Sequence, residues 1–215
     1  MFSDQIIAYA KQFSEMESDL LRELDRAAHL RLLQPRMLSG HMQGLLLRLI
    51  CKMLSPINVL ELGAYSGYST IVLAEALEHP QARLHSIECN EELADFISPF
   101  VQKSQAAERI ILHYASALEI LPFLLQEYRF QLVYIDADKR EYPDYYRMIV
   151  PSLSKGAVIL ADNTLWSGKV VMSSEREKDA QCAAIHRFNQ LVAEDDSVEQ
   201  IILPIRDGLT LIRKK

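Results

Sequence analysis

Apolar residues between the start of the chain and Pro56 recur at helical spacing. Ser14 and Glu17 stand three residues apart, as in a capping box that opens a helix. The accompanying apolar stripe consists of Met16, Leu20, Leu21, Leu24 and Ala28. A second stripe starts near Ser39 and stops at Pro56. These spacings predict helices and no strand in this part of the chain.

Beyond residue 57, short apolar runs alternate with amphipathic stretches. The runs are residues 57–62, 84–88, 110–114, 132–136 and 158–161, and they predict strands. The stretches are residues 69–77, 91–103, 117–127 and 142–153, and they predict helices. Strand, helix and strand repeated in this way form right-handed crossovers, so the pattern predicts a doubly wound α/β fold whose parallel sheet is covered on both faces.

The end of the pattern predicts one more helix and a hairpin. The helix spans residues 177–194, and two strands, 198–205 and 209–213, flank the turn signal Asp207-Gly208. No internal repeat, linker or low-complexity tract interrupts the chain, whose 215 residues fit one domain. We therefore expect a single domain over residues 1–215, with a helical cap over 1–56 and an α/β core over 57–215.

Charge and cysteine content narrow the class of partner and compartment. Lys and Arg number 23 against 29 Asp and Glu, a net charge of −6, so no chain-wide basic field favours nucleic acid. Cys51, Cys89 and Cys182 are too far apart for a zinc motif or a disulfide framework, which favours a reducing cytoplasm. Arg48 and Lys52 interrupt the most apolar helix, so we expect neither export nor membrane insertion.

A glycine turn follows the first predicted strand. In the sequence ELGAYSGYS, Gly63 and Gly67 permit a tight turn and close approach of a ligand to the backbone. Tyr65 and Tyr68 occupy the positions where a dinucleotide-binding turn needs glycine, which disfavours a dehydrogenase. Glu88, at the end of the second strand, can accept both hydroxyls of a ribose. Together these features favour S-adenosylmethionine over NAD, although the turn could also be a plain connection and Glu88 a surface acid.

Acidic residues end the fourth and fifth predicted strands. If these strands are neighbours, Asp136 and Asp162 meet at one edge with Asn163 beside them. Oxygen ligands of this kind suit Mg²⁺ or another hard divalent ion. Lys139 follows Asp136 by three residues, and a cation near a metal is a candidate general base. The alternatives are that Asp136 caps a helix, that Asp162-Asn163 forms a turn, and that Lys139 is a surface residue.

Five blocks in this order resemble the metal-dependent class I O-methyltransferases, the group that includes catechol and caffeoyl-CoA O-methyltransferases. The blocks are ELGAYSGYS, HSIECN, IDADKREYPDYY, ILADNTLWSGKV and RDGLTLIRK. The resemblance implies a Rossmann-like, seven-strand, mostly parallel sheet with an antiparallel last strand. It also implies S-adenosylmethionine as the methyl donor, Mg²⁺ or another divalent cation, and a homodimer.

The same resemblance implies roles for individual residues. Asp136, Asp162 and Asn163 are the expected metal ligands, and Lys139 with Asp136 is expected at the catalytic centre. The expected donor-binding residues are Ser39, Glu61, Gly63, Tyr65, Ser69, Glu88, Ala117 and Asp136. Gln43 stands where many plant relatives carry an acid.

The expected reaction is methyl transfer to one hydroxyl of a catechol-type, vicinal dihydroxy aromatic small molecule. An alternative is methylation of a hydroxylated uridine in tRNA, docked on a local patch formed by Arg22, Arg26, Arg31 and Arg36. A third is a donor-binding protein without catalysis, which would be expected to lose Lys139 or the metal acids. Trp166 is either a wall of the acceptor pocket or a packing residue, and His41 has no assigned role.

Overall fold

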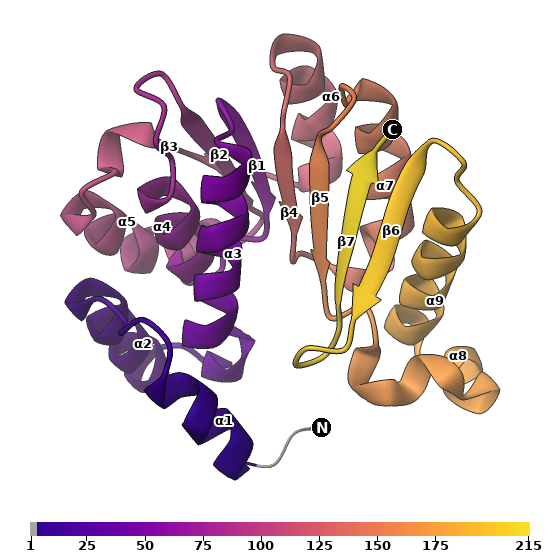
Figure 1. Ribbon diagram of the computed structural model, residues 1–215, viewed down its shortest axis with the longest axis horizontal. Helices are drawn as coiled ribbons and strands as arrows, with labels where there is room; N and C mark the ends of the chain where they lie inside the picture. Colours follow the sequence, from indigo (N-terminus) through magenta and orange to yellow (C-terminus); the bar gives the residue numbers. More distant parts are fainter. Residues whose placement is uncertain (1–3) are drawn as a thin grey trace.

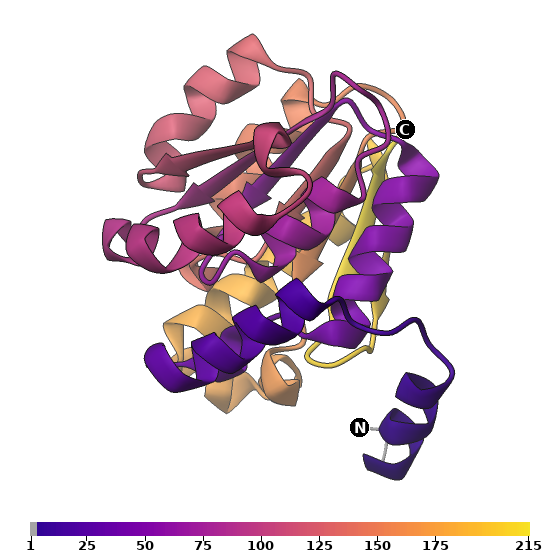
Figure 2. The ribbon, with the colours of Figure 1, turned by 90° about the vertical axis from the view of Figure 1, so that its left-hand side faces the viewer.

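The computed structural model describes residues 4–215 and begins with a helical segment. Its elements are α1 (Asp4–Gln12), α2 (Asp19–Arg31), the 3₁₀ turn η1 (Pro35–Met37) and α3 (His41–Leu54). Figure 2 shows α1 as the outermost of these helices, joined to α2 by residues 13–18. The predicted helical character of this segment is confirmed.

The predicted capping box at Ser14 and Glu17 is wrong. The residue that caps α2 is Ser18, four residues after Ser14, and its side chain accepts a hydrogen bond from the Leu21 amide at 3.3 Å. The Ser14 hydroxyl instead donates to the Ala10 carbonyl at 2.7 Å, which stabilises the end of α1. Glu17 does not complete a capping box, because its carboxylate accepts a hydrogen bond from the hydroxyl of Tyr68.

Seven strands form one sheet in the order β3-β2-β1-β4-β5-β7-β6 (Figure 1). They are β1 (Asn58–Leu62), β2 (Arg83–Glu88), β3 (Ile110–Tyr114), β4 (Leu132–Ile135), β5 (Val158–Asp162), β6 (Val198–Leu203) and β7 (Leu209–Lys214). The first five run parallel to one another, whereas β7 is antiparallel to both β5 and β6. This confirms the predicted seven-strand, mostly parallel sheet with an antiparallel last strand.

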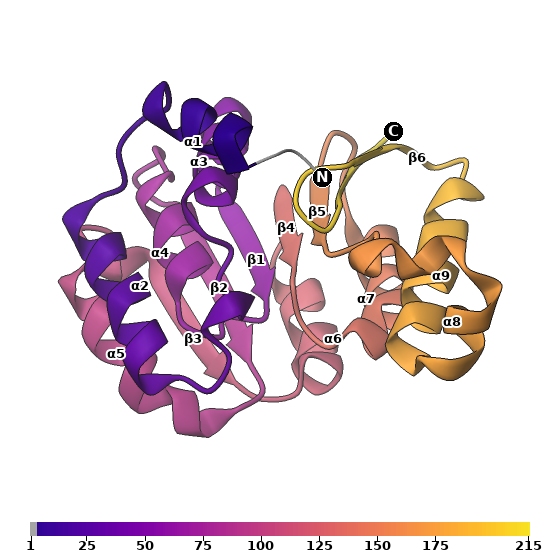
Figure 3. The same cartoon turned by 90° about the horizontal axis from the view of Figure 1, so that it is seen from below.

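Helices cover both faces of the sheet, as Figure 3 shows from below. Besides α2 and α3, they are α4 (Tyr68–Glu75), α5 (Ala94–Lys103), α6 (Ala117–Glu127), α7 (Tyr142–Ile149) and α9 (Ala180–Ala193). Side chains alternate along the strands, so Val59 packs in a cluster with α2 to α5 while Leu60 packs in a second cluster with α6, α7 and α9. The two cores explain why the parallel strands carry apolar residues on both faces.

Short elements correct several predicted boundaries. The helix expected over 91–103 starts as the 3₁₀ turn η2 (Glu91–Leu93), and the one expected over 142–153 ends as η5 (Val150–Ser152). The helix expected over 177–194 is two helices, α8 (Ser173–Lys178) and α9. The break occurs because the Asp179 carboxylate caps α9, accepting hydrogen bonds from the amides of Gln181 and Cys182.

The cap helices share one apolar cluster with the sheet. Leu24 of α2 and Leu47 of α3 pack in the same cluster as Ile71 of α4 and Leu160 of β5. A single domain with a cap over 1–56 and a core over 57–215 stays a prediction, and its residues 1–3 lie outside the described part. Within residues 4–215, every helix is too short or too polar to cross a bilayer.

Candidate functional site

The turn after β1 is tightly packed between the ends of β2 and β4. The amides of Gly63 and Ala64 donate to the Ile87 carbonyl at 2.9 and 3.1 Å. Gly63 has φ +96°, and a Cβ there would lie 2.3 Å from the Asp136 carbonyl oxygen. No side chain fits at that distance, so only glycine lets the turn after β1 and the segment carrying Asp136 lie against each other.

Glu88 is held at the mouth of this turn. It ends β2, is 6% exposed, and accepts hydrogen bonds from the amides of Tyr65 at 2.7 Å and Asn90 at 2.8 Å. A carboxylate oxygen has a second lone pair, so both oxygens can accept further hydrogen bonds from a diol. Ala117 starts α6 close by, because the Ala115 amide donates to the Glu88 carbonyl at 3.0 Å.

Glu61 is a fully buried acid within β1. Its Oε2 accepts hydrogen bonds from the hydroxyls of Thr70 and Ser86, both at 2.5 Å, while its Oε1 is buried without a hydrogen-bond partner. Burial raises the pKa of Glu61 to about 7. A buried carboxylate oxygen without a partner is costly, so this atom can accept a donor group from a ligand. Ser69, on α4, is buried near it in sequence and space.

The two predicted metal acids meet at the ends of neighbouring strands. Strands β4 and β5 pair in parallel, Asp136 follows β4 and Asp162 ends β5. The Tyr134 hydroxyl lies 3.5 Å from Asp136 Oδ2 and 3.3 Å from Asp162 Oδ2. Burial raises the pKa of Asp136 to about 6, against the lowering effect of Lys139, and the charge of Asp162 adds to the rise. Two acids this close favour a shared cation.

Asn163, the third predicted oxygen ligand, follows Asp162 directly in the chain. Its φ is +58°, a left-handed conformation that asparagine tolerates better than most residues. Its backbone amide donates to Asp162 Oδ1 at 2.8 Å. No group of three or more His, Cys, Asp or Glu suited to a metal occurs in residues 4–215. The predicted ligands remain two carboxylates and one amide oxygen, the kind of set that Mg²⁺ binds while keeping its own waters.

Lys139 is buried beside Asp136. It is 7% exposed, and its Nζ donates to Asp136 Oδ1 and to the Tyr142 hydroxyl, both at 2.7 Å. The Tyr142 hydroxyl lies 3.0 Å from the carbonyls of Ile135 and Asp162, to either of which it donates. Tyr142 therefore anchors the lysine between the two strand ends. The surface alternative for Lys139 is wrong, and Tyr142 is a site residue that the sequence reasoning missed although it stands in the same block.

Side chains of the cap and of the turn between β6 and β7 approach Asp162 and Tyr134 across long separations in the chain. Gln43 Nε2 donates to Asp162 Oδ2 at 2.7 Å and to the Tyr134 hydroxyl at 3.0 Å. Ser39 Oγ lies 3.4 Å from the same hydroxyl, which brings this predicted donor residue to the site. Arg206, from the turn between β6 and β7, donates to Gln43 Oε1 at 3.0 Å. Spacing along the chain gives no signal for these long-range contacts.

Trp166 lies in the loop after Asn163. It starts the 3₁₀ segment η6 (Trp166–Val171), and its indole Nε1 donates to Asp179 Oδ2 at 2.9 Å. The residue packs partly against the second apolar cluster. The indole thus fastens this loop to the start of α9, which supports the packing role among the two roles considered for it.

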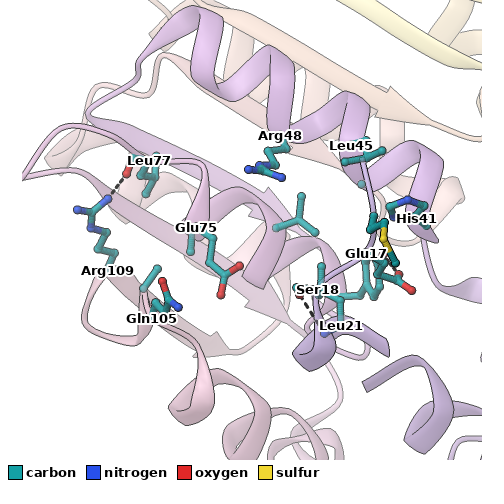
Figure 4. A pocket seen from close by; sticks show the side chains of 16 residues that line it. Glu17, Ser18, Leu21, His41, Leu45, Arg48, Glu75, Leu77, Gln105 and Arg109 are labelled. Atoms are coloured by element: carbon teal, nitrogen blue, oxygen red, sulfur yellow. Dashed lines mark hydrogen bonds between the residues drawn. The ribbon is translucent and has the colours of Figure 1, made fainter. Parts of the chain in front are cut away.

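A separate groove lies between α2, α3 and α4 (Figure 4). Its labelled residues include Glu17, His41, Arg48, Glu75 and Arg109. The His41 ring donates from Nε2 to the Glu15 carbonyl at 2.7 Å, so this histidine fastens the segment before α2. Of the groove residues described within 4–215, none belongs to the predicted donor or metal set. The groove is distinct from the site at the strand ends.

The fold and the strand-end site define a class: a Rossmann-like α/β protein with a glycine turn and buried acids at the carboxyl ends of its parallel strands, where ligands of such sheets bind. The chain belongs to the O-methyltransferase family, whose model matches residues 11–215. It is 31% identical over 181 residues to a caffeoyl-CoA O-methyltransferase of Mesembryanthemum crystallinum, covering 80% of this chain and 70% of that protein.

Solved structures agree with this assignment. The O-methyltransferase TomG of Streptomyces achromogenes, in complex with SAM, has a TM-score of 0.89 and 28% identity over 98% of this chain and 96% of its own. An O-methyltransferase of Bacillus cereus, in complex with SAH, has a TM-score of 0.87 and 26% identity over 98% and 97%. The predicted family, the Rossmann-like fold and the enzyme class, an S-adenosylmethionine-dependent O-methyltransferase, are confirmed.

Proposed function

We propose that this enzyme methylates one hydroxyl of a vicinal dihydroxy aromatic small molecule, and that it needs Mg²⁺ or another hard divalent cation. One observation carries the proposal: Asp136 and Asp162 converge on the Tyr134 hydroxyl, with the buried amine of Lys139 2.7 Å from Asp136. Two acids and a lysine at the end of a parallel sheet are the groups that deprotonation of a chelated diol requires.

The residues present fit a divalent cation. Asp136, Asp162 and Asn163 would hold it, and their oxygen-only chemistry matches Mg²⁺ or Mn²⁺ rather than a softer metal. The raised pKa of Asp136, about 6, reflects a buried acid that a second positive charge would stabilise in its ionised form. When bound, the ion supplies Lewis-acid chemistry, which favours the deprotonated form of a phenol.

The donor-binding set also fits S-adenosylmethionine. We propose that Glu88 binds the ribose hydroxyls and that the unpartnered Oε1 of Glu61 accepts a hydrogen bond from the donor's ammonium group. Gly63 and Tyr65 would contact the donor through the backbone of the turn. Ser39, Ser69, Ala117 and Asp136 complete the proposed pocket.

Lys139 is the proposed proton acceptor. As a neutral amine, its Nζ would take the proton of the acceptor hydroxyl, with Asp136 and Tyr142 fixing its position. The phenolate oxygen then bonds to the methyl carbon while the bond from that carbon to sulfur breaks, which leaves S-adenosylhomocysteine. Since opposite charges cancel in this step, orientation and exclusion of water matter more than stabilising a new ion.

A second hydroxyl on the acceptor is expected to decide turnover. A phenol has a pKa near 10, so at neutral pH only about one molecule in a thousand is ionised. Labelled methyl transfer should therefore be fast with a catechol and slow with the matching monophenol, and EDTA should abolish it. Equal rates for the two acceptors would contradict the chelation proposal.

Asp162→Ala tests the metal assignment directly. The variant is expected to lose metal-dependent activity while calorimetry shows largely intact binding of S-adenosylhomocysteine, because Asp162 belongs to the metal set alone. Loss of donor binding in a folded variant would show that Asp162 serves the donor pocket instead.

The tRNA alternative gains no support from the relatives reported above. Arg22 pairs with Asp19, and the Arg31 guanidinium lies 5.1 Å from the centre of the Phe96 ring, so at least part of the basic patch has partners within the protein. Adding bulk tRNA to the acceptor screen makes this comparison explicit. A cytoplasmic location stays a prediction.

A further inference from the structure

Arg206 reaches from the hairpin turn into the cap. It lies between β6 and β7 with φ +50°, a left-handed conformation that side chains larger than asparagine rarely adopt. Its Nη2 donates to the Leu38 carbonyl at 3.1 Å, and its Nη1 donates to the Ser39 carbonyl and, at 3.0 Å, to Gln43 Oε1. One guanidinium thus binds two carbonyls of the segment that leads into α3 and one side chain of α3 itself.

Gln43 connects Arg206 to Asp162, one of the two proposed metal-binding acids. It is 3% exposed, and its Nε2 donates to both Asp162 Oδ2 and the Tyr134 hydroxyl. A glutamine amide can be placed either way round, with oxygen and nitrogen exchanged. Because Arg206 can only donate, its contact requires the amide oxygen on its own side and turns the amide nitrogen toward Asp162.

We propose that Arg206 is a positioning residue that orients Asp162 through Gln43 and, at the same time, holds the segment at Leu38 and Ser39 in place for the donor. The inference rests on the proposed function for its metal half. Its donor half rests on the contacts to residues 38 and 39. A planar guanidinium can bind these three acceptors together, whereas a lysine ammonium on a flexible stem cannot match the same geometry.

Four variants separate this role from folding and from charge. Arg206→Gly removes the side chain at a backbone conformation that glycine adopts without strain. Arg206→Lys keeps the positive charge and loses the planar guanidinium with its several fixed N–H donors. Gln43→Leu removes the amide and leaves the contacts of Arg206 with the carbonyls. Arg213→Met is the matched control, because Arg213 is in the same hairpin but pairs with Glu199 at 3.4 Å, where β7 faces the start of β5.

Two binding measurements read the effect without turnover. Electron paramagnetic resonance follows the loss of free Mn²⁺ signal, with Mn²⁺ as the probe for a hard divalent ion, and calorimetry measures S-adenosylhomocysteine. We expect Arg206→Gly and Arg206→Lys to bind both ligands about tenfold more weakly or worse, since partners of metal ligands typically contribute 10- to 100-fold to affinity. Gln43→Leu should weaken Mn²⁺ alone, and Arg213→Met should change neither.

The opposite results are equally clear. If folded Arg206→Gly, checked by circular dichroism, binds both ligands as Arg213→Met does, the inference is wrong. Tighter Mn²⁺ binding by Gln43→Leu would also overturn it, because Gln43 would then compete with the ion. If the native enzyme binds S-adenosylhomocysteine and no Mn²⁺, the proposed metal function fails, while the donor measurement on Arg206→Gly still decides whether Arg206 positions the Ser39 segment.

Discussion

At the scale of single residues, Gly63 lets the turn after β1 lie against the segment that carries Asp136. Its φ is +96°, and the Asp136 carbonyl oxygen would lie 2.3 Å from an added Cβ. Gly168 offers a matched comparison, because it has φ +77° and open space within 4 Å of an added Cβ. Both glycines have a positive φ that disfavours other residues, but only Gly63 lacks space for a Cβ.

Gly63→Ala should therefore destabilise the protein far more than Gly168→Ala. Alanine at positive φ costs on the order of 1 kcal/mol at either position, while the clash with Asp136 falls on Gly63 alone. Urea unfolding of both variants measures the difference in the free energy of unfolding. Equal losses would mean that the contact between the turn and Asp136 relaxes without cost.

Lys139 and Tyr142 make a second prediction at this scale. Lys139→Met should lower kcat by about 10² to 10⁴, the range of a general base, with donor binding unchanged. Tyr142→Phe should lower kcat less and shift its pH profile, because the lysine keeps Asp136 and loses one anchor. Turnover of the catechol over a range of pH measures both. Full activity of Lys139→Met would assign the proton transfer elsewhere.

The residues that the sequence predicted are those that follow a strand end. Asp136 and Asp162 could be predicted because β4 and β5 are consecutive buried strands, and parallel neighbours bring their carboxyl ends together. Gln43 and Arg206 could not, because each approaches from an element whose placement over the sheet no local pattern gives. Tyr134 lies inside a strand and resembles any core aromatic residue.

At the scale of elements, β2 and β3 place two histidines in contact. His85 Nδ1 lies 3.1 Å from His113 Nε2, and His85 Nε2 is buried without a partner. The Tyr128 ring centre lies 4.2 Å from that of His85. Burial lowers the pKa of His85 to about 4, with the neighbouring His113 contributing, and burial also lowers the pKa of His113.

This pair should make the fold less stable in mild acid. Between the ordinary histidine pKa of about 6.5 and the folded value of about 4, the unfolded chain binds more protons than the native state. The contribution of His85 is therefore present above about 6.5 and is lost as the pH falls toward 4. Glu61 acts the other way, because its raised pKa, about 7, makes the native state bind more protons above about 4.5.

Comparison of variants isolates the histidine effect from that of Glu61. Urea unfolding of the native protein and of His85→Phe, each at neutral pH and at about pH 5, should show a smaller loss of stability on acidification in the variant. An identical loss in both proteins would mean that this pair does not contribute to acid sensitivity.

Elements were predicted well where a single local rule governs them. Apolar runs identified the five parallel strands to within one residue, since a parallel sheet with two covered faces leaves little else for such runs to form, and the Asp207-Gly208 turn signal located the last two. The capping box failed because Glu17 is drawn to Tyr68, a contact between distant segments. The break at Asp179 likewise depends on one side chain acting as a cap, which competes with the periodicity of the helix.

At the scale of the whole molecule, α1 and the residue that follows it carry exposed apolar side chains. Tyr9 and Phe13 are 64% and 70% exposed, and their ring centres lie 4.7 Å apart. Leu49 and Met53 of α3 are exposed as well. Apolar surface of this kind is typical of an interface. We propose that it serves the homodimer implied by the family resemblance.

Tyr9→Ser combined with Phe13→Ser should then convert a dimer into a monomer. Phe123→Ser is the matched control, because Phe123 on α6 is also 70% exposed but belongs to a different element. Size-exclusion chromatography with light scattering gives the mass of each protein. A native protein that is already monomeric, or a double variant that stays dimeric, would contradict the proposed interface.

The place of β7 in the sheet bears on how the protein is made in the cell. This strand follows all the others in the sequence, yet it pairs with β5 on one side and β6 on the other. Until residues 209–214 have left the ribosome, the chain therefore exposes an open and largely apolar β5 edge, the kind of surface on which nascent chains aggregate. Protection of that edge during translation, by a chaperone or by rapid synthesis, becomes a condition for a good yield of enzyme.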